Sequence, residues 1–460
     1  MNTNKNLQIK ETFNLAIKNH QEDKTDIAQE LYNQVLKINP NHSPALNNLG
    51  VIFKELGENQ KAKKCYEKAI TINPNHVGAH NNLGVIFKEL EEHQKAKDCF
   101  EKVITIDPNH IDALNNLGAV LQDLGEHQKA KDFFEKVITI DPNYVNAYSN
   151  LGAMFQDLGE YQKAEDYYKK AIALKPDHEI SLYNLGVVLY STKQYQNAIE
   201  KLELINFKNS KSVLLNCLYE LNDKDNFFKK LNHMIKQGES NSTIGSLISR
   251  SEIKFGIKKF NPFCEDPLKY TFKTSLTEQY DFKNIFVEPI KNILNEETFF
   301  PRHQGLLKNG HQTAGNLFTK KNDFLDRIKD IIHLEVEKYQ DHFKKSNEGL
   351  ILSWPKSYSI SAWLVSMKSG GKLDPHMHDN GWISGSIYIN VPPKSKSDSG
   401  NLVVCIDNQN PEAEKNINPK KIMDVVTGSL CLFPSSLYHY TIPFESDEKR
   451  IILAFDVKPN

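Results

Sequence analysis

The chain has 460 residues, of which 25% are charged, and its formal net charge is −1. At roughly 100–200 residues per domain, this length allows two to four domains. Acidic and basic residues are nearly balanced, which gives no basis for a general nucleic-acid or anionic-membrane surface. The sequence therefore predicts neither kind of partner.

The cysteines and the N-terminus bear on the compartment. The six cysteines form no C-x-x-C pair, which favours reduced, mostly buried thiols in a reducing compartment. The first residues lack the apolar core of a signal peptide, and the chain has no apolar run of the length that a membrane-spanning helix needs. The sequence therefore predicts a cytoplasmic protein.

The first 200 residues contain an internal repeat. Three sequence markers recur at a spacing of 34 residues, and their agreement makes chance an implausible explanation. The markers are Pro40, Pro74, Pro108, Pro142 and Pro176; Ala28, Ala62, Ala96, Ala130, Ala164 and Ala198; and the Leu-Gly pairs that begin at Leu49, Leu83, Leu117, Leu151 and Leu185.

Each repeat is predicted to be a pair of helices. In the unit over residues 43–76, Leu46 and Leu49 recur at helical spacing, and Gly50 beside them allows a partner helix to approach closely. A Gly-Glu pair then breaks the chain, and a second apolar stripe ends just before Pro74. One hairpin cannot bury its apolar face alone, so we expect the units to stack.

This pattern resembles the tetratricopeptide repeat, with about five matched units over residues 43–207 and a weaker opening unit near residues 7–40. The resemblance implies a superhelix whose concave groove holds a peptide or a helix of a partner protein. Asparagines recur on the first helices of the units. They either hydrogen-bond the backbone of a bound peptide or bridge neighbouring helices. These groove candidates are Asn48, Asn82, Asn116, Asn150 and Asn184.

The repeat period ends near Asn206, and the next segment, 210–236, is predicted to be helical and to cap the array. A domain boundary is expected between about residues 240 and 260. The predicted domains are the repeat array over 1–207, a helical cap and linker over 208–260, and a C-terminal domain over 261–460. Within the last of these, we predict helices at 284–294 and 323–339, and between them a polar, loop-like stretch at 302–318 that could flank a site.

After residue 357 the texture changes to short strands with apolar and polar residues alternating. Strands are predicted at 357–365, 382–390, 401–406, 423–426, 429–433 and 450–457, with turns at Gly370-Gly371 and Thr427-Gly428. Many short strands joined by tight turns indicate a sandwich or a barrel-like roll.

Three histidines and one arginine of this region suit a non-haem iron site that also holds a dicarboxylate. His376 and His378 are two residues apart, so in a strand both side chains would face one cavity, whereas only one need do so if the strand ends there. His439 lies 61 residues after His378, and Arg450 opens the last predicted strand. Imidazoles suit iron, and arginine pairs bidentately with a carboxylate.

Two motifs carry a second resemblance. Residues 376–388 read HMHDNGWISGSIY, and residues 428–439 read GSLCLFPSSLYH. With Arg450, they resemble the iron(II)- and 2-oxoglutarate-dependent dioxygenases, and within them a bacterial and phage branch with the pattern H-x-H followed by W-x-S-G-x-x-Y. The resemblance spans about 263–459. It implies Fe(II), 2-oxoglutarate and O₂, which together hydroxylate a substrate C–H bond.

The second resemblance also completes the predicted fold class. Dioxygenases of this kind have a double-stranded β-helix. We therefore predict a multidomain protein in which an N-terminal α-solenoid of tetratricopeptide repeats precedes a C-terminal double-stranded β-helix (jelly-roll) domain with flanking helices.

The ligand set departs from the usual pattern of this family, which is two histidines and one carboxylate in an H-x-D/E…H arrangement. If His376 is the first ligand, His378 stands at the carboxylate position, and if His378 is the first, Asn380 stands there. Asp374 and Asp379 are nearby but out of register. We predict that the metal ligands are His376, His378 and His439.

The remaining site residues are implied by the same resemblance. Arg450 would bind the distal carboxylate of 2-oxoglutarate, and Tyr388 could add a hydrogen bond to it. No catalytic residue is predicted beyond the metal site.

The sequence supports three functional hypotheses. The first is a hydroxylase whose repeat array recruits a protein or peptide substrate. The second is a non-catalytic interaction scaffold with a degenerate β-helix domain, which the missing carboxylate keeps open. The third is an enzyme acting on a small molecule or a glycan, with the array serving only for localisation.

Overall fold

The computed structural model describes residues 2–207, 209–295, 301–302, 305–313, 315–319, 322–407 and 418–460. It divides into two compact units, Met1–Ala147 and Tyr148–Asn460, and each is treated by itself below. None of the described helices is both long enough and apolar enough to cross a bilayer.

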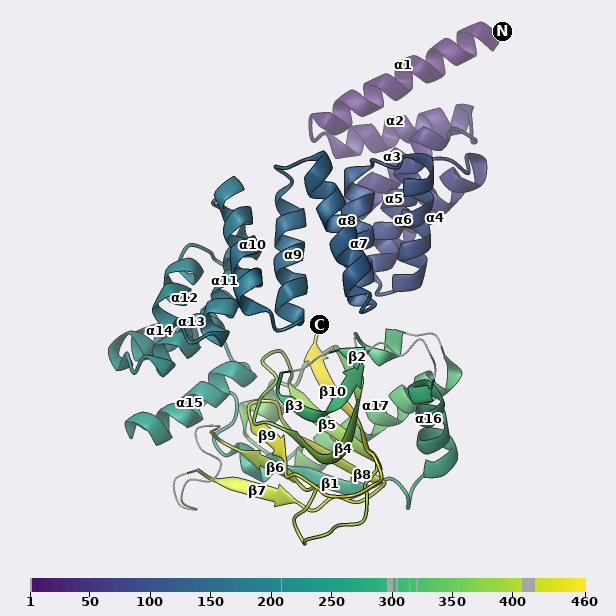
Figure 1. Ribbon diagram of the computed structural model, residues 1–460. Coiled ribbons are helices and arrows are strands. Elements are labelled where there is room, and N and C mark those ends of the chain that lie inside the picture. Colours follow the sequence, from purple (N-terminus) through teal and green to yellow (C-terminus); the bar gives the residue numbers. More distant parts are fainter. Residues whose placement is uncertain are drawn as a thin grey trace. The chain divides into compact units, whose positions relative to one another are not determined.

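Unit 1 is built from antiparallel helix pairs, as the 34-residue period predicts (Figure 1). Its helices are α1 (Asn2–Gln21), α2 (Thr25–Ile38), α3 (Ser43–Glu55), α4 (Asn59–Ile72), α5 (Val77–Glu89), α6 (His93–Ile106), α7 (Ile111–Asp123) and α8 (His127–Ile140). A histidine cap recurs at the start of the first helices. Nδ1 of His42, His76 and His110 accepts a hydrogen bond from the backbone N–H three residues on.

The glycine of each Leu-Gly pair is where the two helices of a repeat pack most closely. A Cβ built on Gly50 would lie 2.6 Å from the ring of Tyr66, and one on Gly118 would lie 2.6 Å from the ring of Phe134. Real Cβ atoms do not approach a ring so closely, so a larger residue would push the helices apart. This confirms the close approach predicted at Gly50.

Unit 2 opens with further helix pairs and then a single helix. Its helices are α9 (Val145–Asp157, which begins in unit 1), α10 (Tyr161–Leu174), α11 (Glu179–Ser191), α12 (Tyr195–Leu202), α13 (Ser210–Glu220), α14 (Lys224–Lys236) and α15 (Ser242–Phe255). The pair α13 and α14 fits the predicted cap. Helix α15 occupies the stretch in which the domain boundary is predicted.

The rest of unit 2 is two antiparallel sheets. The larger sheet has seven strands in the order β1-β8-β5-β10-β4-β3-β2, and the smaller has three in the order β7-β6-β9. The strands are β1 (Phe272–Ser275), β2 (Pro301–Arg302), β3 (Leu307–Thr313), β4 (Tyr358–Leu373), β5 (Ile383–Asn390), β6 (Leu402–Cys405), β7 (Lys420–Met423), β8 (Ser429–Pro434), β9 (Tyr438–Thr441) and β10 (Arg450–Pro459).

The larger sheet has an apolar core on each of its faces. On one face it packs against the α-helices α16 (Glu288–Asn295) and α17 (Asp323–Phe343) through residues such as Ile290, Ile332 and Phe455 (Figure 1). On the other face it packs against the smaller sheet, through residues such as Tyr388, Val404 and Phe433. This layering confirms the predicted jelly-roll with flanking helices. Short helical segments complete this region: η1 (Pro267–Tyr270), η2 (Lys283–Val287), η3 (Leu317–Thr319) and α18 (Gly349–Leu352).

Three local predictions need correction. Gly370-Gly371 does not end a strand, because β4 continues to Leu373 and the pair lies in a bulge opposite β3. The strand predicted at 423–426 is β7, which ends at Met423 because that residue is opposite Leu402 of its partner β6. Part of the stretch predicted as a loop at 302–318 forms β3. Within that stretch, His303, Gln304 and Ala314 lie outside the described residues.

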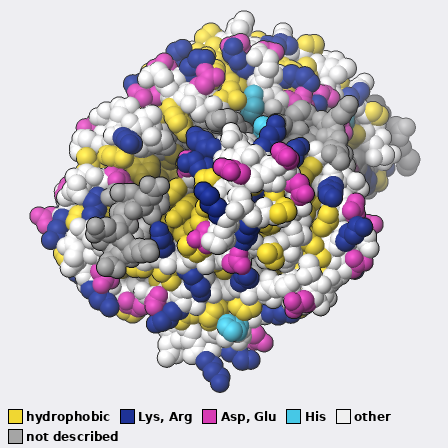
Figure 2. All heavy atoms as spheres, turned by 60° about the horizontal axis from the view of Figure 1, so that its bottom comes forward, with side chains coloured by type: hydrophobic (Ala, Val, Ile, Leu, Met, Phe, Trp, Pro, Cys, Tyr) yellow, Lys and Arg dark blue, Asp and Glu magenta, His cyan; other side chains and the backbone are white. Residues whose placement is uncertain are grey.

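Basic and acidic side chains are interspersed on the face of the molecule shown in Figure 2, as expected from the near-zero net charge. The exception that matters below is local and lies on α13 and α14.

Candidate metal centre

The three predicted histidines lie together. One ring nitrogen from each of His376, His378 and His439 falls within 4.8 Å of the others. A backbone bridge holds two of the three segments. The N–H of His376 donates to the carbonyl of His439 at 3.1 Å, and the N–H of His439 donates back at 2.8 Å. His439 is on β9, while His376 and His378 follow the end of β4, so the bridge closes the cluster across the two sheets.

Hydrogen bonds orient two of these imidazoles. Nδ1 of His376 lies 3.0 Å from the carbonyl oxygen of Asp374, which can only accept, so Nδ1 carries the hydrogen and Nε2 keeps its lone pair. Nδ1 of His378 lies 2.6 Å from a carboxylate oxygen of Asp456. This arrangement likewise leaves Nε2 of His378 free to bind a metal.

A buried network supports Asp456. The side chain of Asp456 is 5% exposed and also accepts a hydrogen bond from the Ser384 hydroxyl at 2.8 Å. Ser384 in turn is 2.8 Å from the Ser435 hydroxyl. Burial by itself would raise the pKa of Asp456, but His378 and Ser384 stabilise the carboxylate and lower the pKa below its usual value. The missing carboxylate of the ligand set therefore has a counterpart one step behind His378.

The surroundings keep the other two imidazoles neutral. Burial lowers the pKa of His376 to about 3, and the neighbouring His378 adds to this effect. Burial also lowers the pKa of His439 well below its usual value. His439 is 6% exposed, and its Nδ1 has no hydrogen-bond partner. Neutral imidazole is the form that binds a metal, so the cluster suits a cation.

Arg450 is fully buried at the start of β10. Its Nη1 donates to the carbonyl oxygen of Gly400, but its Nε and Nη2 have no hydrogen-bond partner. Gly400 has φ +74, and a Cβ there would collide with the guanidinium, so glycine is required on both grounds. The guanidinium carbon lies 5.1 Å from the centre of the Tyr388 ring. An incompletely paired buried cation of this kind suits an anionic ligand.

The alternatives to a histidine ligand lie elsewhere. Asn380 is exposed, and Asp374 pairs with Lys372 at 2.9 Å. The backbone carbonyl of Asp379 accepts hydrogen bonds from Ser242 and Thr243. Within the described residues, the group of metal-ligating side chains at this place contains histidines alone.

The groove asparagines of unit 1 contact one another and the neighbouring helix. The amide of Asn82 donates to Asn47 at 3.2 Å, and that of Asn48 donates to the hydroxyl of Tyr32 at 3.2 Å. Asn116 on α7, and in unit 2 Asn150 on α9 and Asn184 on α11, are half-buried. Part of this series thus bridges helices.

Helix α15 holds both ligand-bearing segments from outside the sheets. At its start, Ser242 and Thr243 donate to the carbonyl of Asp379, the residue after His378. Further along, the guanidinium carbon of Arg250 lies 5.1 Å from the centre of the Tyr438 ring, next to His439 in the chain. The cap is therefore in contact with both parts of the metal centre.

Sequence reasoning missed Asp456, Arg250 and helix α15. Asp456 had a usable signal, since it is the lone charged residue in the apolar run 451–457 of the last strand. Arg250 had none, because its partners come from segments far apart in the chain.

Comparisons with known proteins agree with this architecture. Residues 361–456 match the family model described as "Putative 2OG-Fe(II) oxygenase". Tetratricopeptide-repeat models match residues 43–76, 75–143, 109–177 and 143–204. The chain therefore belongs to the tetratricopeptide-repeat proteins and carries a C-terminal domain of the 2OG-Fe(II) oxygenase family, which is a family of enzymes.

Solved structures resemble only part of the chain. PilF of Pseudomonas aeruginosa is 21% identical, with 42% of this chain and 91% of that chain covered and a TM-score of 0.38. MamA is 28% identical, with 37% and 92% covered and a TM-score of 0.33. A tetratricopeptide-repeat protein of Parabacteroides merdae is 18% identical, with 52% and 97% covered and a TM-score of 0.44. No curated protein matches the sequence.

The family name specifies iron(II) and 2-oxoglutarate, and the residues present fit both. The three imidazoles offer ligand atoms close enough for one ion. The unpaired nitrogens of Arg450 suit a carboxylate.

Proposed function

We propose that this protein is an iron(II)- and 2-oxoglutarate-dependent oxygenase that hydroxylates a protein or peptide substrate recruited by its repeats. The observation that carries the proposal is Arg450, a fully buried guanidinium with two nitrogens lacking partners. Leaving such a group unsatisfied is costly, and the distal carboxylate of 2-oxoglutarate would satisfy it.

Each residue of the centre has a proposed part. His376, His378 and His439 hold the iron, which together with 2-oxoglutarate and O₂ supplies the oxidising chemistry. Arg450 binds and orients the co-substrate, with Tyr388 beside it. Aromatic rings exclude water: Trp363 lies 5.4 Å from His378 and Phe433 lies 4.9 Å from His439, measured between ring centres.

A cavity in unit 2 supports a peptide substrate. It has a volume of about 770 Å³ and is lined by Tyr183 of α11, the start of α15 and the loop of residues 379–382 that follows His378. Asparagine and serine side chains are prominent in its wall, among them Asn241, Asn380 and Ser212. Amides and hydroxyls both donate and accept hydrogen bonds, so they suit the main chain of an extended peptide.

Anaerobic titration with iron(II), with and without 2-oxoglutarate, tests the proposal. We expect a weak visible charge-transfer band that needs both components. The band should disappear in His439→Ala and weaken strongly in Arg450→Ala. Turnover should then release succinate and add the mass of one oxygen atom to a protein substrate. Wild-type activity that both variants retain would overturn the site assignment.

A second candidate function is a non-catalytic repeat scaffold. One observation favours it, namely that the metal-ligating group contains no carboxylate. Iron binding without recruitment of 2-oxoglutarate, or no iron binding at all, would support this candidate.

A further inference from the structure

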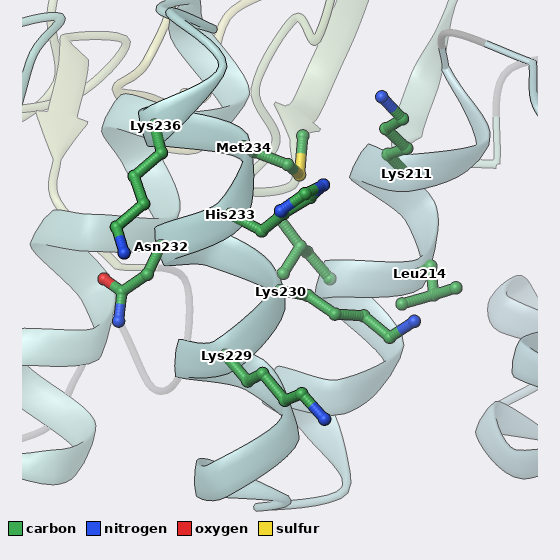
Figure 3. Close-up of a pocket in the computed structure, with 9 residues that line it drawn as sticks. Lys211, Leu214, Lys229, Lys230, Asn232, His233, Met234 and Lys236 are labelled. Atoms are coloured by element: carbon green, nitrogen blue, oxygen red, sulfur yellow. The ribbon is translucent and has the colours of Figure 1, made fainter.

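The cap hairpin of α13 and α14 contains a pocket of about 620 Å³, shown in Figure 3. This volume lies within the roughly 300–1,000 Å³ that is usual for ligand pockets. Leu214 and Leu215 of α13 and Met234 of α14 form its floor, and each is less than 7% exposed. The pocket lies outside the groove that the resemblance assigns to peptides, because it is built by a hairpin beyond the 34-residue period.

The rim of this pocket is basic. Four lysines and one histidine line it: Lys211, Lys229, Lys230, Lys236 and His233. In Figure 3, Lys211 comes from the facing helix α13, and Lys230 extends from α14 toward Leu214. A local excess of one charge sign stands out in a chain whose net charge is −1.

Half of this charge is already balanced. Lys211 pairs with Glu239 at 3.1 Å, and Lys230 pairs with Glu203 at 3.0 Å. Lys229 and Lys236 are exposed, and within the described part of the chain neither has a carboxylate within ion-pair distance. These two lysines are therefore available to an external partner.

We propose that this pocket docks an acidic, amphipathic helical segment of a partner protein. Lys229 and Lys236 are seven residues apart on one helix, which places them about 10.5 Å apart along its axis at 1.5 Å per residue. Carboxylates two helical turns apart on a partner helix match that separation. Large apolar side chains between the carboxylates, on the same face, would fill the space above Leu214 and Met234.

The lining argues against other ligand classes. No aromatic ring lines the pocket, so it offers nothing on which nucleic-acid bases could stack. It contains no arginine, so it lacks the planar fork that recognises phosphate in two places at once. Lysine point charges around an apolar floor suit carboxylates that flank an apolar side chain.

Fluorescence anisotropy on the full chain tests this inference, with a labelled peptide as probe. The peptide is an alanine-based helix with glutamates two turns apart and leucines between them on the same face. We expect saturable binding that weakens with salt. The double variant Lys229→Glu/Lys236→Glu should weaken the binding at least tenfold. The assay needs neither iron nor 2-oxoglutarate, so its failure is separate from failure of the proposed function.

A matched control is Lys224→Glu/Lys258→Glu, which makes the same charge change at two exposed lysines that do not line the pocket. It should bind the peptide as the wild type does. Three outcomes would overturn the proposal. They are no binding by the wild type, equal binding by the pocket variant, and equal binding of a peptide with its leucines moved to the opposite face. Self-association lost in the pocket variant would also overturn it, in favour of a second copy of the chain.

Discussion

Two arginines of unit 2 are almost completely buried, and their surroundings differ. Arg250 on α15 is 1% exposed and is paired on every side. It donates to Asp407 and to Glu220, each at 3.3 Å, and to Asn216 at 3.4 Å. Its guanidinium carbon also lies 4.3 Å from the centre of the Tyr219 ring and 5.1 Å from that of Tyr438.

Arg450 is equally buried but has only one hydrogen-bond partner, a backbone carbonyl. The difference indicates different roles. A buried cation whose donors are all used joins segments of the protein, whereas one with unused donors is arranged for a group that arrives later. On this comparison, Arg250 is a structural cross-link and Arg450 is a ligand-binding residue.

The largest effect on stability is expected from Arg250→Met. It leaves the carboxylates of Asp407 and Glu220 in a mostly buried site without their cation, and breaking a buried pair from one side costs about 3–5 kcal/mol. Urea unfolding should report that loss. Adding Asp407→Asn should recover part of it. A loss below about 1 kcal/mol would contradict the cross-link role.

Arg450→Leu should behave in the opposite way. Without ligand, its free energy of unfolding should stay within about 1 kcal/mol of wild type or rise, because an incompletely paired buried charge is removed. Affinity for 2-oxoglutarate should fall by about 2–5 kcal/mol. Calorimetry with a redox-inert divalent metal measures that affinity. Arg327→Leu, at an exposed arginine of α17, is the control and should change neither quantity.

Asp456→Asn tests whether a fully used carboxylate also matters for a ligand site. The variant keeps the size of the side chain but weakens the hold on Nδ1 of His378. Loss of such a supporting group typically costs 10–100-fold in metal affinity. Competition with a chelator for zinc or cobalt measures it. Asp447→Asn, at an exposed position, should have no effect, and equal affinity in both variants would contradict the role of Asp456.

The smallest effect is expected at the start of α15. Ser242→Ala combined with Thr243→Val removes two hydrogen bonds to the carbonyl of Asp379. Each is worth about 1 kcal/mol, so unfolding should be easier by less than about 2 kcal/mol. Hydrogen exchange in the loop of residues 379–382 should increase while exchange in β5 does not. Unchanged exchange in that loop would show that these contacts do not hold the ligand segment.

The features predictable from the sequence are those repeated or local. The 34-residue period predicts the helix pairs, and Gly50 predicts the close packing against Tyr66, because both patterns lie within one hairpin. The histidine motifs predict which side chains gather, since His376 and His439 lie in recognisable contexts.

The features that could not be predicted depend on distant partners. Arg250 meets Asn216, Asp407 and Tyr438, which belong to three separate segments, and no spacing in the sequence announces that meeting. The bulge at Gly370 depends on the register with β3, which only the folded sheet fixes. Helix α15 is serine-rich and lacks the repeat period, so its pattern gave little to detect.

The position of α15 has a practical consequence for protein engineering. Transplanting this oxygenase onto another recruitment module would tempt a designer to cut after the last helix and keep only the strands. That cassette would lose Arg250, leave Asp407 without its cation and uncover Tyr438 beside a metal ligand. A portable version must instead start ahead of α13, so the cap travels with the enzyme.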